Sequence, residues 1–367
     1  FQAILTSNKN IILFGNIKKL KNIKNKFLKN KISFFEKNDF FKILSSLKGK
    51  SFCIDSKTCS VFYEKLINSR FLIKKRVDPI NDLKSIKNNT EIKNMIEAHI
   101  KDGIAVTKFL HWIKNSNIKK LDEIKVEKKL ENFRKQNKNY LFPSFSTIAG
   151  SGPNGAIIHY RSNIKSNRKL NKDHLLLLDS GGQYKWGTTD ITRTISFSDP
   201  SKKTKELYTR VLKGHIAVAM SKIDKLKNGN NIDKLARKSL NSINLDYRHG
   251  TGHGVGFFMN VHEGPQSISK NNFIKLKKGM IVSNEPGIYL ENKLGIRIEN
   301  LVYIDGNNKN LFFKNLTFAP LEKDLIDENM LTKIEKDYIF SYHLETYSKL
   351  SAYLNNKERK WLAKLIQ

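Results

Sequence analysis

The amino-acid sequence predicts an α+β fold in which a small α/β domain precedes a larger mixed domain and a short helical region. The chain has 367 residues, more than one ordinary domain needs, and 39% of them are hydrophobic, which allows a sizeable core. Strands alternate with helices at the start of the chain, and glycine-punctuated strands dominate the middle. Amphipathic helices return after Pro320.

The first part of the chain, up to about Lys84, has the alternating pattern of a small α/β domain. Strands are expected at residues 1–6, 10–15 and 51–55, and helices at residues 18–30 and 39–49. Residues 77–91, punctuated by Pro79, are expected to form a connector.

Periodicity predicts the elements that follow. Apolar residues spaced roughly three or four apart predict an amphipathic helix from Glu91 to about Asn115. These residues are Ile92, Met95, Ile96, Ile100, Ile104 and Phe109. Further helices are expected at residues 121–136, 204–227 and 232–242, and strands with glycine turns at residues 143–193 and 249–304.

The net charge of +33 is extreme and would suit a polyanionic partner. However, the lysines are scattered and interleaved with asparagine rather than massed beside aromatic residues. Abundant Lys, Asn and Ile together are also typical of A/T-rich codons. We therefore predict no specific nucleic-acid site and at most weak binding to DNA at low salt.

The two cysteines, Cys53 and Cys59, match no zinc motif and make no disulfide framework, so a reducing, cytoplasmic location is expected. No run of about 18 apolar residues predicts a membrane span. Because the sequence begins with Phe1 rather than Met, we expect a fragment or a processed form.

Five side chains suited to hard metal ions are the most informative feature of the sequence. Each lies in a short apolar stretch punctuated by glycine, where an isolated charge is costly to bury unless it is paired or bound to metal. These residues are Asp179, Asp190, His253, Glu285 and Glu299. Four carboxylates and one imidazole are what two adjacent divalent metals require.

Two hairpins are predicted to bring the carboxylates together in pairs. In a symmetric hairpin centred between residues 184 and 185, Asp179 and Asp190 lie directly opposite, with Cβ atoms roughly 4.5–5.5 Å apart. Glu285 and Glu299 repeat this geometry around Asn292. Taken alone, the aspartates could be ordinary residues near a turn, and Glu299 could be an exposed strand residue or an ion-pair partner of a nearby arginine.

His253 lies in the segment HGTGHGVG, whose glycines allow sharp turns and close packing. A single histidine in such a segment is more often structural than ligating, but two facing carboxylate pairs favour a metal site. The donor set suits Mn²⁺, Co²⁺, Fe²⁺ or Zn²⁺. Two such ions about 3.5–4 Å apart share a water, lower its pKa and clamp a carbonyl, which is the chemistry of amide hydrolysis.

Other catalytic signatures are absent from the sequence, which contains no G-x-S-x-G, H-E-x-x-H or G-x-x-x-x-G-K-[ST] motif. The segments around the five residues resemble the pita-bread metallopeptidases, and within them the Xaa-Pro aminopeptidases (aminopeptidase P) of the long, three-domain cytosolic type. The resemblance rests on GPNGAIIHY, LDSGGQYKWGTTDITRT, LKGHIAVAM, HGTGHGVGFFMNVHEGP, NEPGIY and GIRIEN.

This resemblance covers nearly the whole chain and implies its domain organisation. Residues 1–84 would form a creatinase-like α/β domain, the second domain of the long type. Residues 85–318 would form the pita-bread catalytic domain and residues 319–367 a C-terminal helical domain, which LTFAPLEKDLID resembles. A further N-terminal domain of the long type, which shapes substrate access and dimer contacts, has no counterpart before Phe1.

The resemblance also implies how the metals would be held. Asp179 would chelate one ion, and Asp190 and Glu299 would bridge both. His253 and Glu285 would hold the second. Mn²⁺ is the first candidate for both ions, with Co²⁺ or Zn²⁺ as alternatives. A metal-bridging hydroxide would attack the peptide bond before proline, and Glu285 would carry a proton to the leaving proline nitrogen.

Five further residues acquire roles by the same resemblance. His249 and His262 would hydrogen-bond the substrate and the tetrahedral intermediate. His159 would line the pocket on the proline side. Tyr289 and Arg297 would lie at the rim of the site and support proton movement.

The predicted function is therefore a dinuclear metal-dependent aminopeptidase acting on peptides with proline in second position. Prolidase, restricted to Xaa-Pro dipeptides, and methionine aminopeptidase are the enzymatic alternatives. VHEGP and the long helical C-terminal region disfavour both. A third alternative is a pita-bread protein that has lost catalysis and become a binding module, although all five ligands are present.

A homodimer through the C-terminal helices is also predicted, because relatives of the long type pair through this region. Apolar residues recur there at helical spacing, in excess of what one small domain needs for its share of the core. The alternative is that this face packs on the catalytic domain. The residues are Ile334, Tyr338, Ile339, Tyr342, Leu350, Tyr353, Leu354, Trp361, Leu362 and Leu365.

Overall fold

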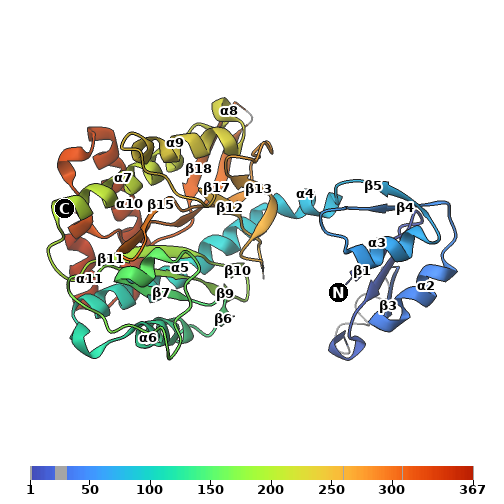
Figure 1. Ribbon diagram of the computed structural model, residues 1–367, viewed down its shortest axis with the longest axis horizontal. Helices are drawn as coiled ribbons and strands as arrows, with labels where there is room; N and C mark the ends of the chain where they lie inside the picture. Colours follow the sequence, from blue (N-terminus) through green and yellow to red (C-terminus); the bar gives the residue numbers. More distant parts are fainter. Residues whose placement is uncertain (1, 21–30, 259, 308, 367) are drawn as a thin grey trace. The chain divides into compact units, whose positions relative to one another are not determined.

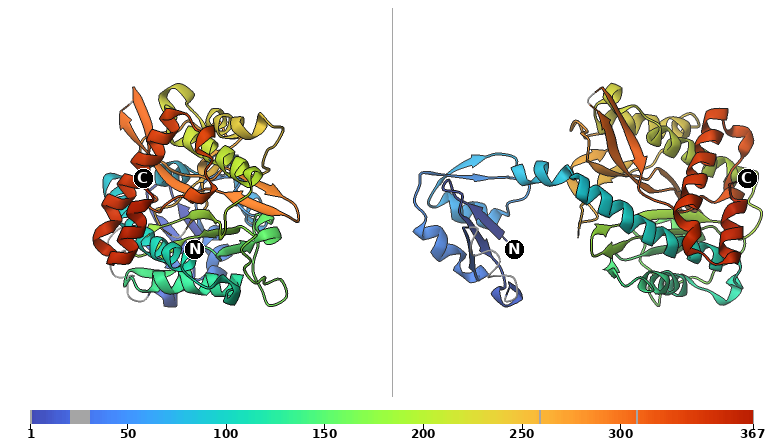
Figure 2. Two further views of the ribbon diagram at one scale, coloured as in Figure 1. Left: turned by 90° about the vertical axis from the view of Figure 1, so that its left-hand side faces the viewer. Right: turned by 180° about the vertical axis from the view of Figure 1, so that it is seen from behind.

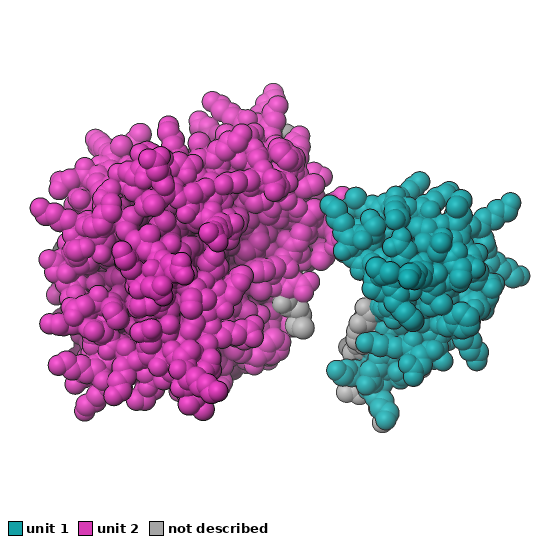
Figure 3. Space-filling view, in the orientation of Figure 1, with its two compact units in different colours: residues 1–80 teal, residues 81–367 magenta. Residues whose placement is uncertain are grey.

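The computed structural model describes residues 2–20, 31–258, 260–307 and 309–366. The chain divides into two compact units, residues 1–80 and residues 81–367 (Figure 3). No described helix is both long enough and apolar enough to cross a membrane.

The first unit is a small α/β domain, as predicted. β1 and β2 are antiparallel, β2 and β3 are parallel, and β4 and β5 form a second, parallel pair. Phe14, Phe40, Leu44 and Ile67 are buried in its core. The elements are β1 (Gln2–Leu5), β2 (Ile11–Phe14), β3 (Ile32–Phe35), α2 (Phe40–Ser46), β4 (Ser51–Ile54), α3 (Val61–Asn68) and β5 (Leu72–Lys75).

The three predicted strands and the helix predicted at residues 39–49 are confirmed in this unit. β3, α3 and β5 were not predicted. Most of the helix predicted at residues 18–30 falls on residues 21–30, which lie outside the described residues; residues Ile17–Leu20 form one turn of 3₁₀-helix.

The predicted connector at residues 77–91 is wrong, because it contains α4 (Pro79–Ser85) and the start of α5 (Asn89–Lys114). Proline is well suited to the first turn of a helix, where its missing N–H is not needed. α5 begins at a capping box: Asn88 accepts from the Glu91 amide at 2.9 Å, and Glu91 accepts from the Asn88 amide at 2.8 Å.

Among the described residues the second unit contains four sheets, and two of them each pack against a pair of helices (Figure 1). A three-stranded sheet in the order β11-β8-β7 packs against α5 and α6, with Phe109, Leu130, Leu176 and Ile191 in their common core. The predicted helices at residues 91–115 and 121–136 are confirmed. The elements are α6 (Glu123–Lys135), β6 (Tyr140–Pro143), β7 (Ile148–Ser151), β8 (Leu176–Ser180), β9 (Gly182–Tyr184), β10 (Gly187–Thr188) and β11 (Ile191–Ile195).

A five-stranded antiparallel sheet in the order β13-β12-β14-β17-β18 packs against α7 and α9 through Val218, Ile232, Val282 and Val302. The helix predicted at residues 204–227 is two helices, because the chain turns at Met220–Lys222 and starts again as α8. The elements are α7 (Lys202–Ala219), α8 (Ile223–Leu226), α9 (Gly229–Asn241), β12 (Gly252–Gly254), β13 (Glu263–Ile268), β14 (Ile281–Asn284), β15 (Gly287–Leu290), β16 (Leu294–Arg297), β17 (Asn300–Asn307) and β18 (Asn310–Asn315).

The chain ends in two helices, α10 (Lys333–Leu350) and α11 (Asn356–Lys364), which lie beside α5 (Figure 2). Leu350, Leu354 and Leu362 form a buried cluster with Phe318 and the apolar face of α5. Part of the apolar surface predicted for a dimer therefore packs within this unit. Ile334 remains 63% exposed.

Candidate metal centre

Asp179 lies on β8, the central strand of the three-stranded sheet, and Asp190 directly precedes β11. The structure corrects the predicted register of this pair. Thr192, not Asp190, is the partner of Asp179 in the ladder of β8 and β11. The tip of this hairpin lies between Lys185 and Trp186, because Gly187 pairs with Tyr184. The shift is two residues, so Asp190 stays on the same face as Asp179 but is displaced along the strand.

The glutamate pair has the register that the sequence predicts. Asn284 pairs with Asn300 in β14 and β17, and Gly287 pairs with Arg297 in β15 and β16. Glu285 and Glu299 are counterparts in this common register. Asn292, the predicted midpoint, has a φ of 56°, a left-handed turn conformation that asparagine tolerates well.

His253 lies on β12 and joins the two pairs. Its Nε2 is 3.5 Å from Asp190 Oδ2 and 3.5 Å from Glu285 Oε1. Its Nδ1 lies 3.0 Å from the carbonyl oxygen of Gly254. A proton on Nδ1 donated to that carbonyl leaves the Nε2 lone pair facing the carboxylates, which is the tautomer of a metal-ligating histidine.

Asp179, Asp190 and Glu299 are buried close together, which raises the pKa of each carboxyl. Burial raises the pKa of Asp190 well above its usual value, and the charges of Asp179 and Glu285 raise it further. Burial likewise raises the pKa of Glu299 well above its usual value, and Asp190 adds to the effect. Ligand atoms of Asp190, His253 and Glu299 all lie within 4.8 Å of one another.

Divalent ions fit this arrangement, because they supply the positive charge that the cluster lacks. A second observation agrees: Asp179 Oδ1 is buried and has no hydrogen-bond partner among the described residues. The other oxygen, Oδ2, accepts from Arg297 at 2.6 Å. An acceptor left free on a buried carboxylate is suited to a metal ion.

Arg297, Tyr289 and His249 form a chain of contacts behind the carboxylates. Arg297 donates to the Tyr289 hydroxyl at 2.6 Å, and that hydroxyl lies 2.9 Å from His249 Nε2. Burial raises the pKa of Tyr289 to about 12 and lowers the pKa of His249. At neutral pH the phenol and the imidazole are therefore both uncharged.

The remaining histidines extend away from the carboxylates. The rings of His253 and His262 are 4.0 Å apart. Burial lowers the pKa of His262, and the nearby His253 and His159 lower it further. A cavity of about 480 Å³ contains every predicted site residue except Tyr289, which lies behind Arg297. Its size falls in the range of small-molecule sites.

Sequence reasoning missed several residues that support this centre. Thr192 donates to Glu299 Oε2 at 2.8 Å and accepts from Arg297 Nε at 3.1 Å. Ser283 donates to Glu285 Oε1 at 3.1 Å and accepts from the His253 amide at 2.9 Å. The only sequence signal for Thr192 is its place two residues after Asp190, in TDITRT.

An α+β fold whose cavity is lined by four carboxylates and several imidazoles has a donor set typical of metal-dependent hydrolases. The chain belongs to metallopeptidase family M24, whose profile matches residues 93–306. The C-terminal region of this peptidase family matches residues 309–367, and the creatinase/prolidase N-terminal domain matches residues 1–91. The fold class predicted from the sequence is confirmed.

Known relatives carry the names that the sequence motifs suggested. Aminopeptidase P2 of Arabidopsis thaliana is 46% identical over 77% of this chain and 42% of its own length. Xaa-Pro aminopeptidase 1 of Dictyostelium discoideum is 38% identical over 99% of this chain and 61% of its own length. The chain thus spans about half the length of the curated relatives it matches.

Solved structures agree on the fold. X-prolyl aminopeptidase from Caenorhabditis elegans, described as a cytosolic enzyme with a di-nuclear active site, superposes with a TM-score of 0.91 at 29% identity. The match covers 99% of this chain and 62% of that one. Prolidase from Pyrococcus furiosus matches with a TM-score of 0.70 at 28% identity, over 85% of this chain and 88% of its own.

Proposed function

We propose that this protein is a metal-dependent Xaa-Pro aminopeptidase that removes the residue before proline from the N-terminus of peptides. The observation that carries the proposal is the position of His253, whose Nε2 lies 3.5 Å from carboxylate oxygens of both Asp190 and Glu285. The printed names of the relatives and the family membership support the same activity.

In this proposal Asp179 binds one metal, Asp190 and Glu299 bind both, and His253 and Glu285 bind the other. Two divalent ions, for which Mn²⁺ is our first candidate, would polarise the peptide carbonyl and lower the pKa of a bridging water to give the attacking hydroxide. The sum of their charges balances the four carboxylates.

The protein's own side chains would then orient the substrate and move protons. Glu285 would hold a proton and deliver it to the leaving proline nitrogen. His262 and His159, on the wall beyond His253, would contact the intermediate and the proline side of the substrate. His249 would reach the substrate by exchanging its present contact with the Tyr289 hydroxyl.

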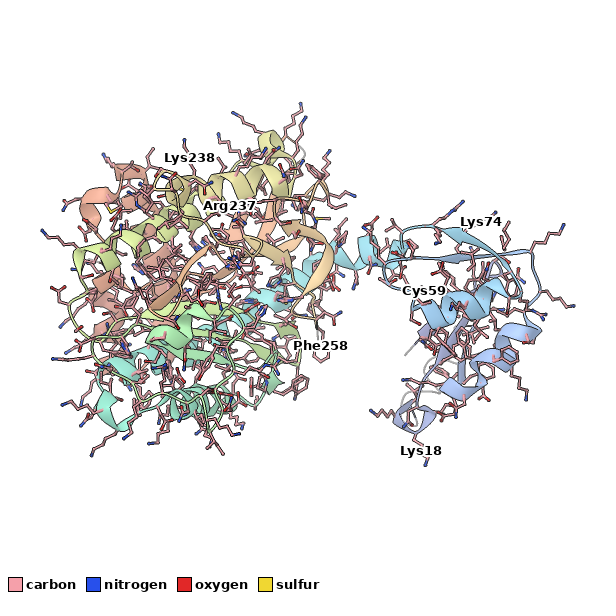
Figure 4. The ribbon with its side chains drawn as sticks, in the orientation of Figure 1. Lys18, Cys59, Lys74, Arg237, Lys238 and Phe258 are labelled. Carbon is pink, nitrogen blue, oxygen red and sulfur yellow. The ribbon has the colours of Figure 1, made fainter. Side chains whose placement is uncertain are left out.

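The wider setting of the enzyme is part of the proposal. We propose a cytoplasmic homodimer without a specific nucleic-acid partner, and domain boundaries at residues 1–84, 85–318 and 319–367. The C. elegans enzyme is described as cytosolic, which supports the proposed location. Lys18 and Lys74 are exposed and extend from separate places on the first unit, which is unlike one basic groove (Figure 4).

A metal-loading and peptide experiment tests the function. Protein stripped with chelator and reloaded with Mn²⁺ is expected to hold close to two ions per chain. It should then release the first residue from peptides of three or more residues with proline second, and act far more slowly when alanine is second. Asp190→Asn and Glu299→Gln should lose both metal and activity.

The same experiment separates the alternatives. Turnover of Xaa-Pro dipeptides alone would assign the protein to the prolidases. A wild-type protein that binds no divalent metal at micromolar concentration would contradict the catalytic proposal and favour a binding module.

A further inference from the structure

Arg161 is a cationic side chain on the cavity wall that forms no ion pair among the described residues. It is exposed and lines the cavity of the candidate metal centre. Its guanidinium makes no ion pair or hydrogen bond with any residue in the part of the chain that the structure describes. Arg297, which also lines the cavity, is by contrast committed to Asp179 and Tyr289.

The backbone at Arg161 is held in place by its neighbour. Tyr160 is only 4% exposed, and its hydroxyl donates to Glu123 Oε2 at 2.7 Å and to the Ser166 carbonyl at 2.8 Å. Because Tyr160 points into the protein, His159 and Arg161 on either side of it both face the cavity. Arg161 is thus presented from an anchored segment.

Arg161 is an exposed member of the cavity lining that also includes the metal ligands. His253 contacts the carboxylates, the His262 ring lies 4.0 Å from that of His253, and His262 is electrostatically coupled to His159. Arg161 follows two residues after His159 and is exposed, whereas Asp190 and Glu299 are buried. The cavity lining therefore includes both buried carboxylates and an exposed arginine.

Charge determines which end of a peptide can pass Arg161. The guanidinium repels the ammonium group of the first residue and attracts a carboxylate. In the proposed reaction only one residue precedes the cleaved bond, so the rest of the peptide has to leave along the open end of the cavity. Two divalent ions would balance the four carboxylates, which leaves the charge of Arg161 uncompensated.

We propose that Arg161 is a specificity-determining residue that binds a carboxylate of the peptide on the C-terminal side of proline. The carboxylate is either the side chain of an acidic third residue or the C-terminus of a tripeptide. A guanidinium suits both, because its planar donors match the two oxygens of a carboxylate. This inference rests on the proposed aminopeptidase function and names its preferred substrates.

Paired peptides test the inference. The Mn²⁺-loaded protein is expected to cleave Ala-Pro-Glu-Ala-amide about three- to five-fold more efficiently than Ala-Pro-Gln-Ala-amide, through KM rather than kcat, as befits one partly exposed ion pair. Ala-Pro-Ala should be preferred over its amide for the same reason. The first pair reports on a side-chain carboxylate and the second on a C-terminal one.

Two variants and a control connect these preferences to Arg161. Arg161→Ala should abolish both preferences. Arg161→Glu should reverse the side-chain preference, so that Ala-Pro-Lys-Ala-amide is cleaved more efficiently than Ala-Pro-Glu-Ala-amide. Lys165→Glu, an exposed charge reversal on the same segment that does not line the cavity, should leave them unchanged. Preferences that persist in Arg161→Ala, or that are absent from the wild type, would overturn the inference.

The proposed aminopeptidase function is tested separately from the role of Arg161. It fails if the wild-type protein does not cleave even Ala-Pro-Gln-Ala-amide. Calorimetric titration of the metal-loaded protein with Pro-Glu and Pro-Gln then decides on Arg161 without turnover. The two dipeptides are used as their C-terminal amides, so that only the side chain of Pro-Glu-amide carries a carboxylate. Tighter binding of Pro-Glu-amide that is lost in Arg161→Ala supports the inference, and equal binding of the two amides overturns it.

Discussion

At the scale of single residues, the carboxylates of the metal centre should destabilise the metal-free protein as the pH rises. The pKa of Asp190 is raised by burial and by the charges of Asp179 and Glu285. The folded protein therefore retains a proton that the unfolded chain has released. The protonated Asp190 carboxyl contributes fully to the stability of the folded protein below the unfolded-state pKa of about 3.9. This contribution is lost as the pH rises through the folded-state pKa of Asp190.

Asp190→Asn is consequently expected to stabilise the protein in chelator at pH 8 by about 1–3 kcal/mol, and to change it little near pH 4. Thermal unfolding across this pH range measures the effect. Asp173→Asn, a substitution of an exposed aspartate, serves as the control. An Asp190→Asn protein no more stable than wild type at pH 8 would show that the cluster is not strained by its own charge.

Sequence reasoning predicted which residues lie at the metal centre better than how they contact one another. The Glu285–Glu299 register followed from a turn centred on Asn292. The Asp179–Asp190 register was wrong by two residues, because the sequence SGGQYKWGTT does not specify which residues form the tip. The face was nevertheless correct, since side chains alternate with a period of two. Contacts across the fold, such as Thr192 with Glu299, leave no local pattern.

At the scale of elements, Arg193 on β11 connects the backbone at Glu299, just before β17, to the C-terminal region. It is 2% exposed, and it donates to the Glu299 carbonyl at 2.7 Å and to the Pro320 carbonyl at 2.8 Å. It also donates to the Tyr342 hydroxyl at 2.9 Å, and that hydroxyl donates to the Ala319 carbonyl at 2.7 Å. These hydrogen bonds therefore link α10 to β11 and to the backbone at Glu299.

Tyr342→Phe should lower the free energy of unfolding by about 1–2 kcal/mol, because it leaves buried partners of the hydroxyl unsatisfied. Urea denaturation followed by circular dichroism measures this. Tyr353, 52% exposed, provides the matched Tyr→Phe control, for which a change within about 0.5 kcal/mol is expected. Equal effects of the two substitutions would contradict the structural role assigned to Tyr342.

Long elements with strong periodicity were predicted well, and short ones were not. α5 and α6 each show a clear apolar face, so their existence and approximate bounds followed from spacing. β3, β5 and α4 have four to seven residues, with few buried side chains to mark a period. The break between α7 and α8 was missed because residues 220–222 contain neither glycine nor proline.

At the scale of the whole molecule, part of the apolar surface of the C-terminal region is buried and part is open. Tyr342, Leu350 and Leu362 are buried within the second unit, which accounts for part of the predicted excess. Phe340 and Leu344, one helical turn apart on α10, remain 51% and 47% exposed. Residues four apart lie on the same helix face, so these two form a small apolar surface without a partner among the described residues.

If the protein is a homodimer through α10, these two side chains should be at its interface, where exposed apolar residues gain most from burial. Sedimentation of the intact chain at tens of micromolar should then give a species near twice its mass of 42.4 kDa. The double substitution Phe340→Lys and Leu344→Lys should yield monomer, because it places like charges against each other across a two-fold axis. Two exposed apolar residues of the first unit, Phe41 and Phe62, are 61% and 67% exposed and provide the control. Changing them to lysine should leave the dimer intact. A wild-type monomer, or a dimer that survives the changes on α10, would rule out this interface.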